Sequence, residues 1–388
     1  MSHDLLLLTP GPTAVADEVR LALAEPAPNP DIDPGFAELY RDVAAKLGRL
    51  MGTSAPVLIL PGEGLCGLEA AVAALVEPGE AVICLDNGVF GGGFADFVAR
   101  YGGRPLVLRE EYDRPFSPGA VAAFADQHPE ARVATLVHCE TPAGLINPVA
   151  GIIPELARRG IITIVDAVSS LGGEPFAADA WGADIVLGAS QKCLSAPPGL
   201  AFLSVSERAW ERIAARKSPV PGFYLNLTVW RENWLARGEF PYTQSAALVA
   251  ALNVACERLL GEDDPVRRHA AIAAAVRAAL TDGGLSLYAA PEGRSNTVTA
   301  VRVPLGVDDA RFRQQLVERH GLMIGGSFGP FAGKLWRIGH MGEGASSAAM
   351  FRVFHAFDRL LPESGFWPET QLTEAFARHL VGVEREPH

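Results

Sequence analysis

Lys192 and Asp166 are the two residues whose types and positions most clearly indicate chemistry. Lys192 follows the apolar run Asp184–Gly188, and Asp166 ends the apolar run Ile161–Asp166. Both runs predict buried strands, and the carboxyl ends of neighbouring parallel strands meet at one edge of a sheet. A lysine amine there can form a Schiff base with an aldehyde, while a carboxylate keeps a pyridine nitrogen protonated so that the ring accepts electrons. The pair therefore predicts a site for a pyridoxal-type ring.

A glycine loop, Pro61–Glu69, follows another apolar run and opens a predicted helix. Gly62, Gly64 and Gly67 have the G-x-G-x-x-G spacing, and Asp86 lies about where a ribose-binding acid is expected. On pattern alone this is a dinucleotide-binding fingerprint. The simpler interpretation is a tight strand-to-helix turn, with Asp86 as a loop residue.

Glu63 argues against a dinucleotide in this loop. Its carboxylate would share the loop with a pyrophosphate, and two like charges about 4 Å apart repel by about 4 kcal/mol at an effective dielectric of about 20. The dinucleotide hypothesis also gives Asp166 and Lys192 no role. A nicotinamide-dependent dehydrogenase stays as the alternative from another chemical class. A non-catalytic binding protein ranks last, because it too has no use for the two residues.

Size and composition bound the class of protein. The chain has 388 residues, of which 49% are hydrophobic and 20% charged, as is typical of a globular enzyme with a large and a smaller domain. The formal net charge of −12 argues against a nucleic-acid partner. No apolar run approaches the roughly 20 residues that cross a bilayer, so no membrane partner is expected. The first residues lack a basic flank and a cleavage site, so we expect mature sequence.

The cysteines give a further indication of environment. Five are scattered without paired spacing, which predicts reduced thiols in a cytoplasmic protein. Cys193, directly after Lys192, is a minor candidate for a nucleophile. We predict no metal site.

Strand-like runs alternate with Ala-rich amphipathic stretches, which predicts an α/β domain with a mostly parallel sheet of seven strands. The strands are expected at Val57–Leu60, Ala81–Asp86, Pro105–Leu108, Val133–His138, Ile161–Asp166, Asp184–Gly188 and Leu200–Val205. Helices are expected between them, among others at Leu68–Val76, Gly119–Gln127 and Ile152–Arg159.

The alternation stops at the aromatic segment Tyr224–Tyr242. Beyond it, helices are expected at Ser245–Leu260, Pro265–Leu280, Asp308–Arg319 and Ser346–Leu361, and strands at Thr297–Val303 and Gly321–Ile324. This pattern predicts a large α/β domain over residues 15–264. It predicts a smaller α+β domain over residues 265–388, together with residues 1–14.

Several motifs together resemble the class V aminotransferases, a family of fold-type I pyridoxal-dependent enzymes. The matching stretches are Thr9–Thr13, Gly67–Ala70, Thr141–Gly144, Asp166–Ser170, Gly188–Lys192, Pro197–Gly199 and Gly333–Gly339. The resemblance runs from Thr9 to about Leu361. It implies the fold-type I architecture, which agrees with the expected α/β domain and the smaller α+β domain.

The resemblance also implies roles for individual residues around the ring. These are Lys192 as the Schiff-base lysine, Asp166 as partner of the pyridine nitrogen, Val168 beneath the ring, Phe90 stacked above it and Thr141 near its 3-oxygen. Gly64 of the glycine loop and Gln191, in the phosphate-binding sequence Ser190-Gln191, are expected to complete the cofactor site.

Arg337 is expected to bind the substrate α-carboxylate through a two-pronged contact, for which a planar guanidinium is suited. A nearby acid could instead pair with Arg337, and Phe90 could be an ordinary core residue. Asp86, His138 and His340 are interpreted as loop or core polar groups.

Glu63 departs from the pattern of ordinary family members, whose glycine loops cradle the cofactor phosphate with neutral or donor residues. An ionised carboxylate repels a phosphate dianion but accepts a hydrogen bond from a hydroxyl group. Phe240 stands where the family often places a phosphate-binding tyrosine from a neighbouring subunit. We therefore expect the loop to hold the 5′-hydroxymethyl group of an unphosphorylated ring.

Several stretches also resemble a branch of the family that uses free pyridoxamine. The sequence thus predicts transfer of the amino group of pyridoxamine to pyruvate, giving pyridoxal and L-alanine in vitamin B6 degradation, with no tightly bound cofactor. The alternative is an alanine- or serine:glyoxylate-type aminotransferase with bound pyridoxal phosphate. Phe328 stands where that branch suggests a second arginine, so the oxo acid is less certain than the ring. A homodimer or homotetramer is expected, with Tyr224–Tyr242 crossing the interface.

Overall fold

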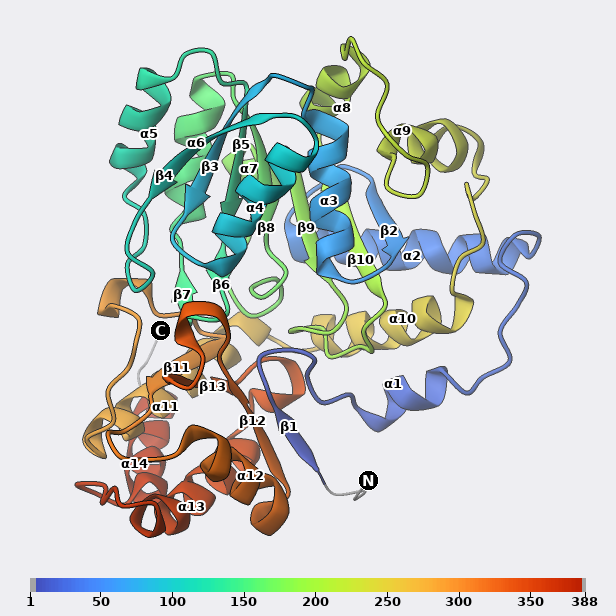
Figure 1. Ribbon diagram of the computed structural model, residues 1–388. Coiled ribbons are helices and arrows are strands. Elements are labelled where there is room, and N and C mark those ends of the chain that lie inside the picture. Colours follow the sequence, from blue (N-terminus) through green and yellow to red (C-terminus); the bar gives the residue numbers. More distant parts are fainter. Residues whose placement is uncertain (1–4, 386–388) are drawn as a thin grey trace.

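A seven-stranded sheet forms the centre of the larger part of the molecule (Figure 1). The computed structural model describes residues 5–385. The strands lie in the order β2-β10-β9-β8-β5-β3-β4, and β10 runs antiparallel to both of its neighbours. Their bounds are β2 (Val57–Pro61), β3 (Ala81–Asp86), β4 (Arg104–Arg109), β5 (Val133–Val137), β8 (Ile162–Asp166), β9 (Ile185–Ala189) and β10 (Leu200–Val205).

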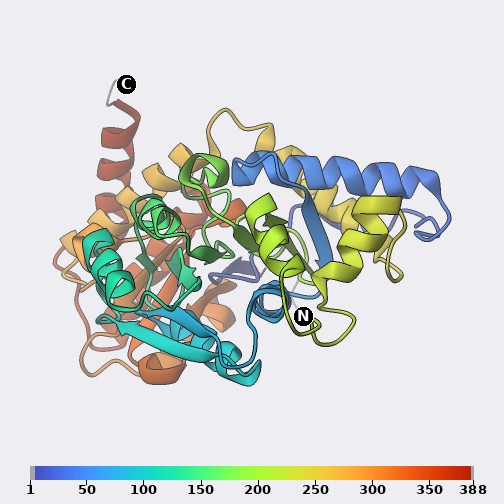
Figure 2. The ribbon, with the colours of Figure 1, turned by 90° about the horizontal axis from the view of Figure 1, so that it is seen from above.

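The apolar composition of these strands follows from their burial. Every residue of β3, β5, β8, β9 and β10 is buried, because helices flank the sheet on both sides (Figures 1 and 2). These helices are α2 (Pro34–Met51), α3 (Gly64–Leu75), α4 (Val89–Arg100), α5 (Pro118–Gln127), α6 (Val149–Arg158), α7 (Ala178–Trp181), α8 (Glu207–Ala214) and α10 (Ala246–Leu260). Residues 227–235 form the short helix α9 (Leu227–Trp230) and the π-helical turn η1 (Arg231–Leu235).

A four-stranded sheet forms the second part, in the order β1-β12-β13-β11 (Figure 1, lower half). Its strands are β1 (Leu6–Leu8), β11 (Val298–Arg302), β12 (Leu322–Gly326) and β13 (Leu335–Gly339). The helices around it are α11 (Pro265–Asp282), α12 (Asp309–His320), α13 (Ser347–Glu363) and α14 (Leu372–Arg385). Its separate core includes Trp336 stacked on Phe312, with ring centroids 4.3 Å apart.

Short elements join the two parts. These are α1 (Asp17–Ala22), the hairpin β6 (Cys139–Glu140) and β7 (Leu145–Ile146), and the 3-10 turns η2 (Pro291–Gly293), η3 (Gly329–Phe331) and η4 (Gly342–Gly344). Because β1 pairs with β12 in parallel, Leu6–Leu8 form part of the four-stranded sheet.

The predicted fold class is confirmed, including the seven-stranded, mostly parallel sheet. The division into residues 15–264 and residues 265–388 with 1–14 stays a proposal, and residues 1–4 and 386–388 of it lie outside the described residues. Helix α2 was not predicted, although Asp33 caps it by accepting a bond from Gly35 N at 2.8 Å and Gly52 ends it at φ 62°.

Two further properties concern the described residues alone. None of their helices has both the length and the apolar composition to span a membrane. Over the same residues, no three or more His, Cys, Asp and Glu side chains group in a way that could hold a metal ion.

Candidate active site

Lys192 lies in the turn after β9, and its side chain reaches the N-terminal segment. Its Nζ donates to the backbone oxygen of Pro10 at 2.8 Å. Gly11 has φ 94°, and a Cβ there would lie 2.4 Å from Lys192 Cδ, so only glycine leaves room for the lysine. Burial lowers the pKa of the Lys192 amine, Asp166 opposes this shift, and the guanidinium of Arg337 adds to it. The amine is therefore prepared to act in its neutral, nucleophilic form.

Asp166 ends β8, the strand next to β9, as the sequence predicted. Its Oδ1 accepts a hydrogen bond from Val168 N at 2.8 Å, and its side chain is buried. Burial raises the pKa of Asp166 to about 6, while the Val168 amide and Lys192 oppose the rise and Glu63 adds to it. A buried carboxylate of this kind is stabilised by a cation, and a protonated ring nitrogen supplies one.

A cavity of about 220 Å³ lies between these residues. It is lined by Gly11, Pro12, Glu63, Gly64, Leu65, Leu68, Phe90, Cys139, Asp166, Val168, Ser169, Gln191 and Lys192. The backbone of Gly64 approaches Val168 so closely that a Cβ would lie 2.9 Å from its Cγ2. The cavity thus brings together the predicted residues Glu63, Gly64, Phe90, Asp166, Val168, Gln191 and Lys192.

Glu63 is the N-cap of α3, and its Oε1 accepts a hydrogen bond from Leu65 N at 3.1 Å. A helix N-terminus is a favourable place for an anion, because its first N–H groups lack partners within the helix. Here the carboxylate of Glu63 itself occupies that place. The side chain is exposed, so it can also accept a bond from a ligand in the cavity.

Gln191 offers a polar group without a protein partner. Its side chain is buried, and its Oε1 has no hydrogen-bond partner within the described part of the chain. A buried amide oxygen without a partner is unfavourable, so a ligand that donates to it gains affinity. The backbone oxygen of Gln191 accepts from Thr13 N at 3.2 Å, which ties this turn to the N-terminal segment.

Thr141 is buried just outside the residues that line the cavity. Its Oγ1 lies 2.5 Å from Ser169 Oγ, and Ser169 does line the cavity. Thr141 therefore reaches the ring site through Ser169, which the sequence analysis did not single out. The run Asp166–Ser170 was the available signal for it.

Phe90 stands in the first turn of α4, and Glu140 determines where that turn begins. The carboxylate of Glu140 accepts from Phe90 N at 3.2 Å and from Gly91 N at 2.6 Å. A Cβ at Gly88 would lie 2.1 Å from Glu140 Cδ, so glycine is needed there for space. Burial raises the pKa of Glu140 to about 8. Glu140 was missed by the sequence analysis, although it directly precedes Thr141.

Arg337 lies in β13 and outside the cavity lining. Its Nε donates to Gly326 O at 2.8 Å, and its guanidinium lies 5.2 Å from the centroid of the Phe328 ring. Within residues 5–380, whose side chains are described, no acid pairs with Arg337. The structure therefore does not support the alternative that a nearby acid pairs with it. Burial, and then Arg313, lowers the pKa of Arg337 to about 10. A cation in this condition is stabilised by an anionic ligand.

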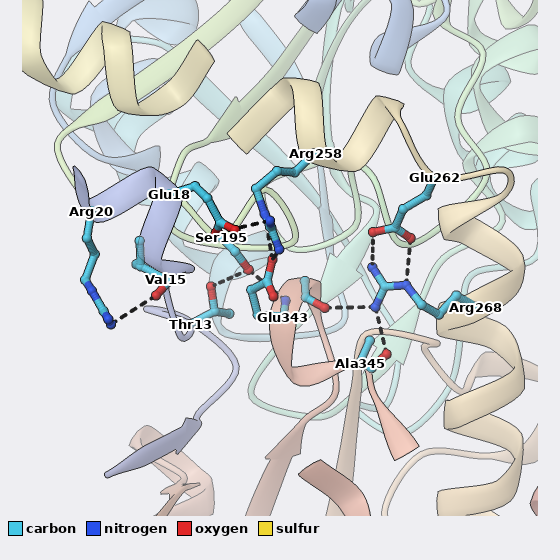
Figure 3. Close-up of polar contacts among 11 residues, drawn as sticks. Thr13, Val15, Glu18, Arg20, Ser195, Arg258, Glu262, Arg268, Glu343 and Ala345 are labelled. Carbon is cyan, nitrogen blue, oxygen red and sulfur yellow. Dashed lines mark hydrogen bonds and ion pairs between the residues drawn. The ribbon is translucent and has the colours of Figure 1, made fainter. Parts of the chain in front are cut away.

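The turn that carries Lys192 is also held from its outer side (Figure 3). Ser195 has φ 54°, and its N donates to Lys192 O at 2.9 Å. Thr13 Oγ1 donates to the same oxygen at 3.0 Å, and Glu343 N donates to Ser195 Oγ at 2.9 Å. Arg258 of α10 pairs with Glu343 at 3.0 Å. The N-terminal segment, the large sheet and the small sheet therefore meet at this turn.

The surroundings of the remaining sequence candidates favour structural roles for them. Burial raises the pKa of the Cys193 thiol, which disfavours the thiolate that a nucleophile needs. Asp86 pairs with Arg109 at 3.3 Å at the end of β3. Burial lowers the pKa of His138 and of His340 to about 3, so both are neutral at physiological pH.

Phe240 does not point out of its own chain. It stacks on Trp234 with ring centroids 4.3 Å apart and lies edge-on to Tyr40. Thr243 Oγ1 donates to Asp31 of the same chain at 2.8 Å. Tyr224, at the other end of the aromatic segment, is exposed.

Comparisons with known proteins agree with this geometry. Residues 121–324 match the family Aminotransferase class-V. The pyridoxamine–pyruvate transaminase of Mesorhizobium japonicum is 39% identical over 344 residues, which cover 88% of this chain and 87% of that protein. The crystal structure of pyridoxamine–pyruvate aminotransferase from Mesorhizobium loti has a TM-score of 0.93 at 35% identity, covering 98% of each chain. That of ureidoglycine–glyoxylate aminotransferase from Bacillus subtilis has a TM-score of 0.94 at 28% identity, covering 100% of this chain and 99% of the other.

One expectation is overturned by these matches. Class V aminotransferases depend on pyridoxal 5′-phosphate, so the expectation that no cofactor is tightly bound is wrong. Lys192 and Asp166, the two groups that the ring of this cofactor requires, line one cavity, and the Glu63 carboxylate beside it already accepts the N–H of Leu65. Sequence analysis gave the single charge of Glu63 too much weight against these contacts.

Proposed function

This chain belongs to the class V aminotransferase family, and we propose that it transfers the amino group of pyridoxamine to pyruvate, giving pyridoxal and L-alanine. The observation that carries the proposal is the carboxylate of Glu63, which caps α3 beside the cavity. At this position it can accept a hydrogen bond from the 5′-hydroxyl of pyridoxamine. The likeness to a pyridoxamine–pyruvate transaminase over most of both chains supports the same donor.

The residues around the cavity have separate tasks in this reaction. When bound, the pyridoxal-type ring supplies a carbonyl that condenses with amines and a conjugated system that accepts an electron pair. Asp166 keeps the ring nitrogen protonated, so that this electron pair is stabilised. Val168, Gly64 and Phe90, which line the cavity, would pack against the ring.

Lys192 moves the proton that amino transfer requires. Its lowered pKa favours the neutral amine, which can accept a proton from one carbon and return it to another. The same amine would form the Schiff base with the carbonyl of a bound pyridoxal-type ring. Gln191, and Thr141 through Ser169, donate to or accept from the polar edge of the ring.

Arg337 binds the carboxylate of the oxo acid. A planar guanidinium presents two parallel N–H donors to a carboxylate, and within the described part of the chain the bond of Arg337 to the protein uses its Nε, which leaves the two Nη groups for a ligand. This contact fixes the position of the oxo-acid carbon that receives the amino group.

We also propose that the protein forms a homodimer or homotetramer in the cytoplasm. Ile32, Phe223 and Tyr224 expose large apolar side chains, and a surface cleft of about 530 Å³ runs between the segments around Ile32 and Tyr242. Apolar surface of this kind is typical of an interface between subunits. The cysteines are free thiols, as expected in a reducing compartment.

The test is a set of parallel assays on purified protein. Pyridoxamine is offered with pyruvate, glyoxylate or oxaloacetate, and the amino acid and pyridoxal formed are measured together. Equal amounts of alanine and pyridoxal from pyruvate are expected. Turnover confined to protein loaded with pyridoxal phosphate, with alanine or serine as donor and glyoxylate as acceptor, would replace the proposed donor by that of the alternative.

A further inference from the structure

Phe328 stands on a segment that links the small sheet to the large one. It follows β12 and directly precedes the turn η3. Ser327 Oγ donates to Pro142 O at 3.2 Å, which attaches the segment to the loop after Glu140. Phe328 is 42% exposed, an unusual position for a large apolar side chain unless a ligand or another surface covers it.

The ring of Phe328 contacts the proposed carboxylate-binding residue. The guanidinium of Arg337 lies over this ring at 5.2 Å from its centroid, which is a cation–π contact. The bond from Arg337 Nε to Gly326 O at 2.8 Å holds the same guanidinium from the side. Phe328 and Gly326 together therefore fix the direction in which the remaining N–H groups of Arg337 point.

The same ring also contacts a residue that lines the ring-binding cavity. Phe328 and Phe90 lie edge-on, with centroids 6.4 Å apart and an angle of 80° between their planes. Phe90 lines the cavity. Phe328 is thus placed between the residue that packs on the ring and the residue that binds the oxo-acid carboxylate, where the rest of the acceptor must lie.

Arg313, the cation whose charge adds to the effect of burial in lowering the pKa of Arg337, is already paired with an acid. Arg313 lies directly behind Gly326, since a Cβ there would be 2.8 Å from its Cζ. Its Nε and Nη2 donate to the carboxylate of Asp309 at 2.7 and 2.9 Å, so its charge is already balanced by an acid. A second carboxylate on the acceptor would therefore lose water against an aromatic ring without gaining a partner, which is unfavourable.

We propose that Phe328 determines the specificity for the amino acceptor: it positions Arg337 for one carboxylate and presents an aromatic wall to the rest of the molecule, selecting monocarboxylic 2-oxo acids with small apolar side chains over dicarboxylic ones. This inference rests on the proposed function and deepens it, because it names the class of acceptor.

The experiment compares Phe328→Leu, Phe328→Tyr and Phe328→Arg with the unmodified enzyme, using pyridoxamine with pyruvate or oxaloacetate. Leucine keeps apolar volume but removes the π-system, so KM for pyruvate rises about tenfold, equivalent to about 1.4 kcal/mol, with little change in kcat. Tyrosine keeps the π-system and restores KM to within about twofold. Arginine raises kcat/KM for oxaloacetate relative to pyruvate by at least about tenfold, because it supplies the missing cation.

Two controls separate a local effect from a general one. KM for pyridoxamine stays within about twofold in all three variants, since Phe328 is absent from the cavity lining. Trp367→Leu removes an aromatic residue that is 72% exposed and remote from these contacts, and it leaves all constants unchanged. A Leu variant with unchanged KM for pyruvate, together with an Arg variant of unchanged acceptor preference, overturns the inference.

Failure of the proposed function gives a different result. In that case the unmodified enzyme forms no alanine from pyridoxamine and pyruvate, but transfers amino groups after loading with pyridoxal phosphate. The Phe328 series is then measured with alanine and glyoxylate, whose carboxylates use the same arginine. A tenfold rise in KM for glyoxylate in the Leu variant still supports the role of Phe328, and no rise still contradicts it.

Discussion

The two ends of the cavity are built in different ways. At one end, Lys192 and Asp166 are fixed by backbone groups, through Pro10 O at 2.8 Å and Val168 N at 2.8 Å. Their positions follow from neighbouring buried strands, so changing them means changing the sheet. This end supplies the chemistry that all members of the family need.

At the other end, Glu63 is exposed, and within the part of the chain that the structure describes its side chain bonds to the first turn of its own helix, at Leu65 N. Its replacement disturbs no core packing. Buried strands therefore fix Lys192 and Asp166, whereas under the proposed function a single exposed carboxylate selects the form of the ring. Variants of residues at both ends of the cavity test this difference, and Lys192 is expected to have the largest effect.

Lys192→Ala is expected to lower kcat by more than about 10³-fold, because the proton acceptor and covalent attachment point are lost together. The measurement is amino transfer, with the ring absorbance of the purified protein recorded in parallel. Cys193→Ser is the matched neighbour and should stay within a few-fold. Loss of activity in the Cys193 variant with retention in the Lys192 variant would instead identify a thiol nucleophile.

Asp166→Asn is expected to lower kcat by about 10²–10³-fold, since the ring nitrogen loses its charged partner. Its effect on stability has the opposite sign. The pKa of Asp166 is raised to about 6 in the folded, ring-free protein, so ionisation opposes folding as pH rises through 6. The ring-free variant should therefore have a higher Tm than the unmodified protein at pH 8, and the difference should shrink at pH 5. A difference that grows on acidification would contradict the burial argument.

Glu63→Gln is expected to raise KM for pyridoxamine by about tenfold and to strengthen binding of pyridoxal phosphate by a similar factor. The amide keeps the shape of the side chain but removes its charge and weakens it as an acceptor. Glu69→Gln, on the same helix and bonded to Tyr101 at 2.9 Å, is the matched control and should change neither value. Steady-state kinetics gives KM for pyridoxamine. Titration with pyridoxal phosphate, followed by absorbance, gives the affinity for that form of the ring.

Ser195→Ala is expected to have the smallest effect. The variant leaves Glu343 N without its acceptor, which costs about 1–3 kcal/mol if the amide stays buried. Thermal unfolding should show a lower Tm, and kcat should fall only a few-fold as the Lys192 turn loosens. Ser195→Gly relieves the positive φ but also lacks the acceptor, so equal stability of the two variants would mean that backbone strain contributes little.

Much of the larger sheet could be predicted because its strands are buried on both faces and therefore appear as continuous apolar runs, such as Ile162–Asp166. Helix α4 could not, because Gly91, Gly92 and Gly93 hide its periodicity. Its start is determined by Glu140, a residue of another strand that no local pattern connects to Phe90.

The site shows the same limit. Lys192 and Asp166 could be found because Asp166 ends a predicted strand and Lys192 closely follows another. Pro10 could not, since its contact depends on how the N-terminal segment folds back onto the large sheet. Ser169 lies in the matched run Asp166–Ser170, but its contact with Thr141 joins two loops 28 residues apart in the sequence. Such long-range contacts have no signature within a short window of sequence.

The role proposed for Glu63 is tested most directly by a competition between pyridoxamine and pyridoxamine 5′-phosphate. Equal concentrations of both are given to the enzyme with limiting pyruvate, and the pyridoxal and pyridoxal phosphate formed are quantified by mass spectrometry. If Glu63 accepts the 5′-hydroxyl of pyridoxamine, pyridoxal is the main product, and Glu63→Gln moves the ratio toward pyridoxal phosphate. Predominance of pyridoxal phosphate with the unmodified enzyme, or a ratio unaffected by Glu63→Gln, would contradict it.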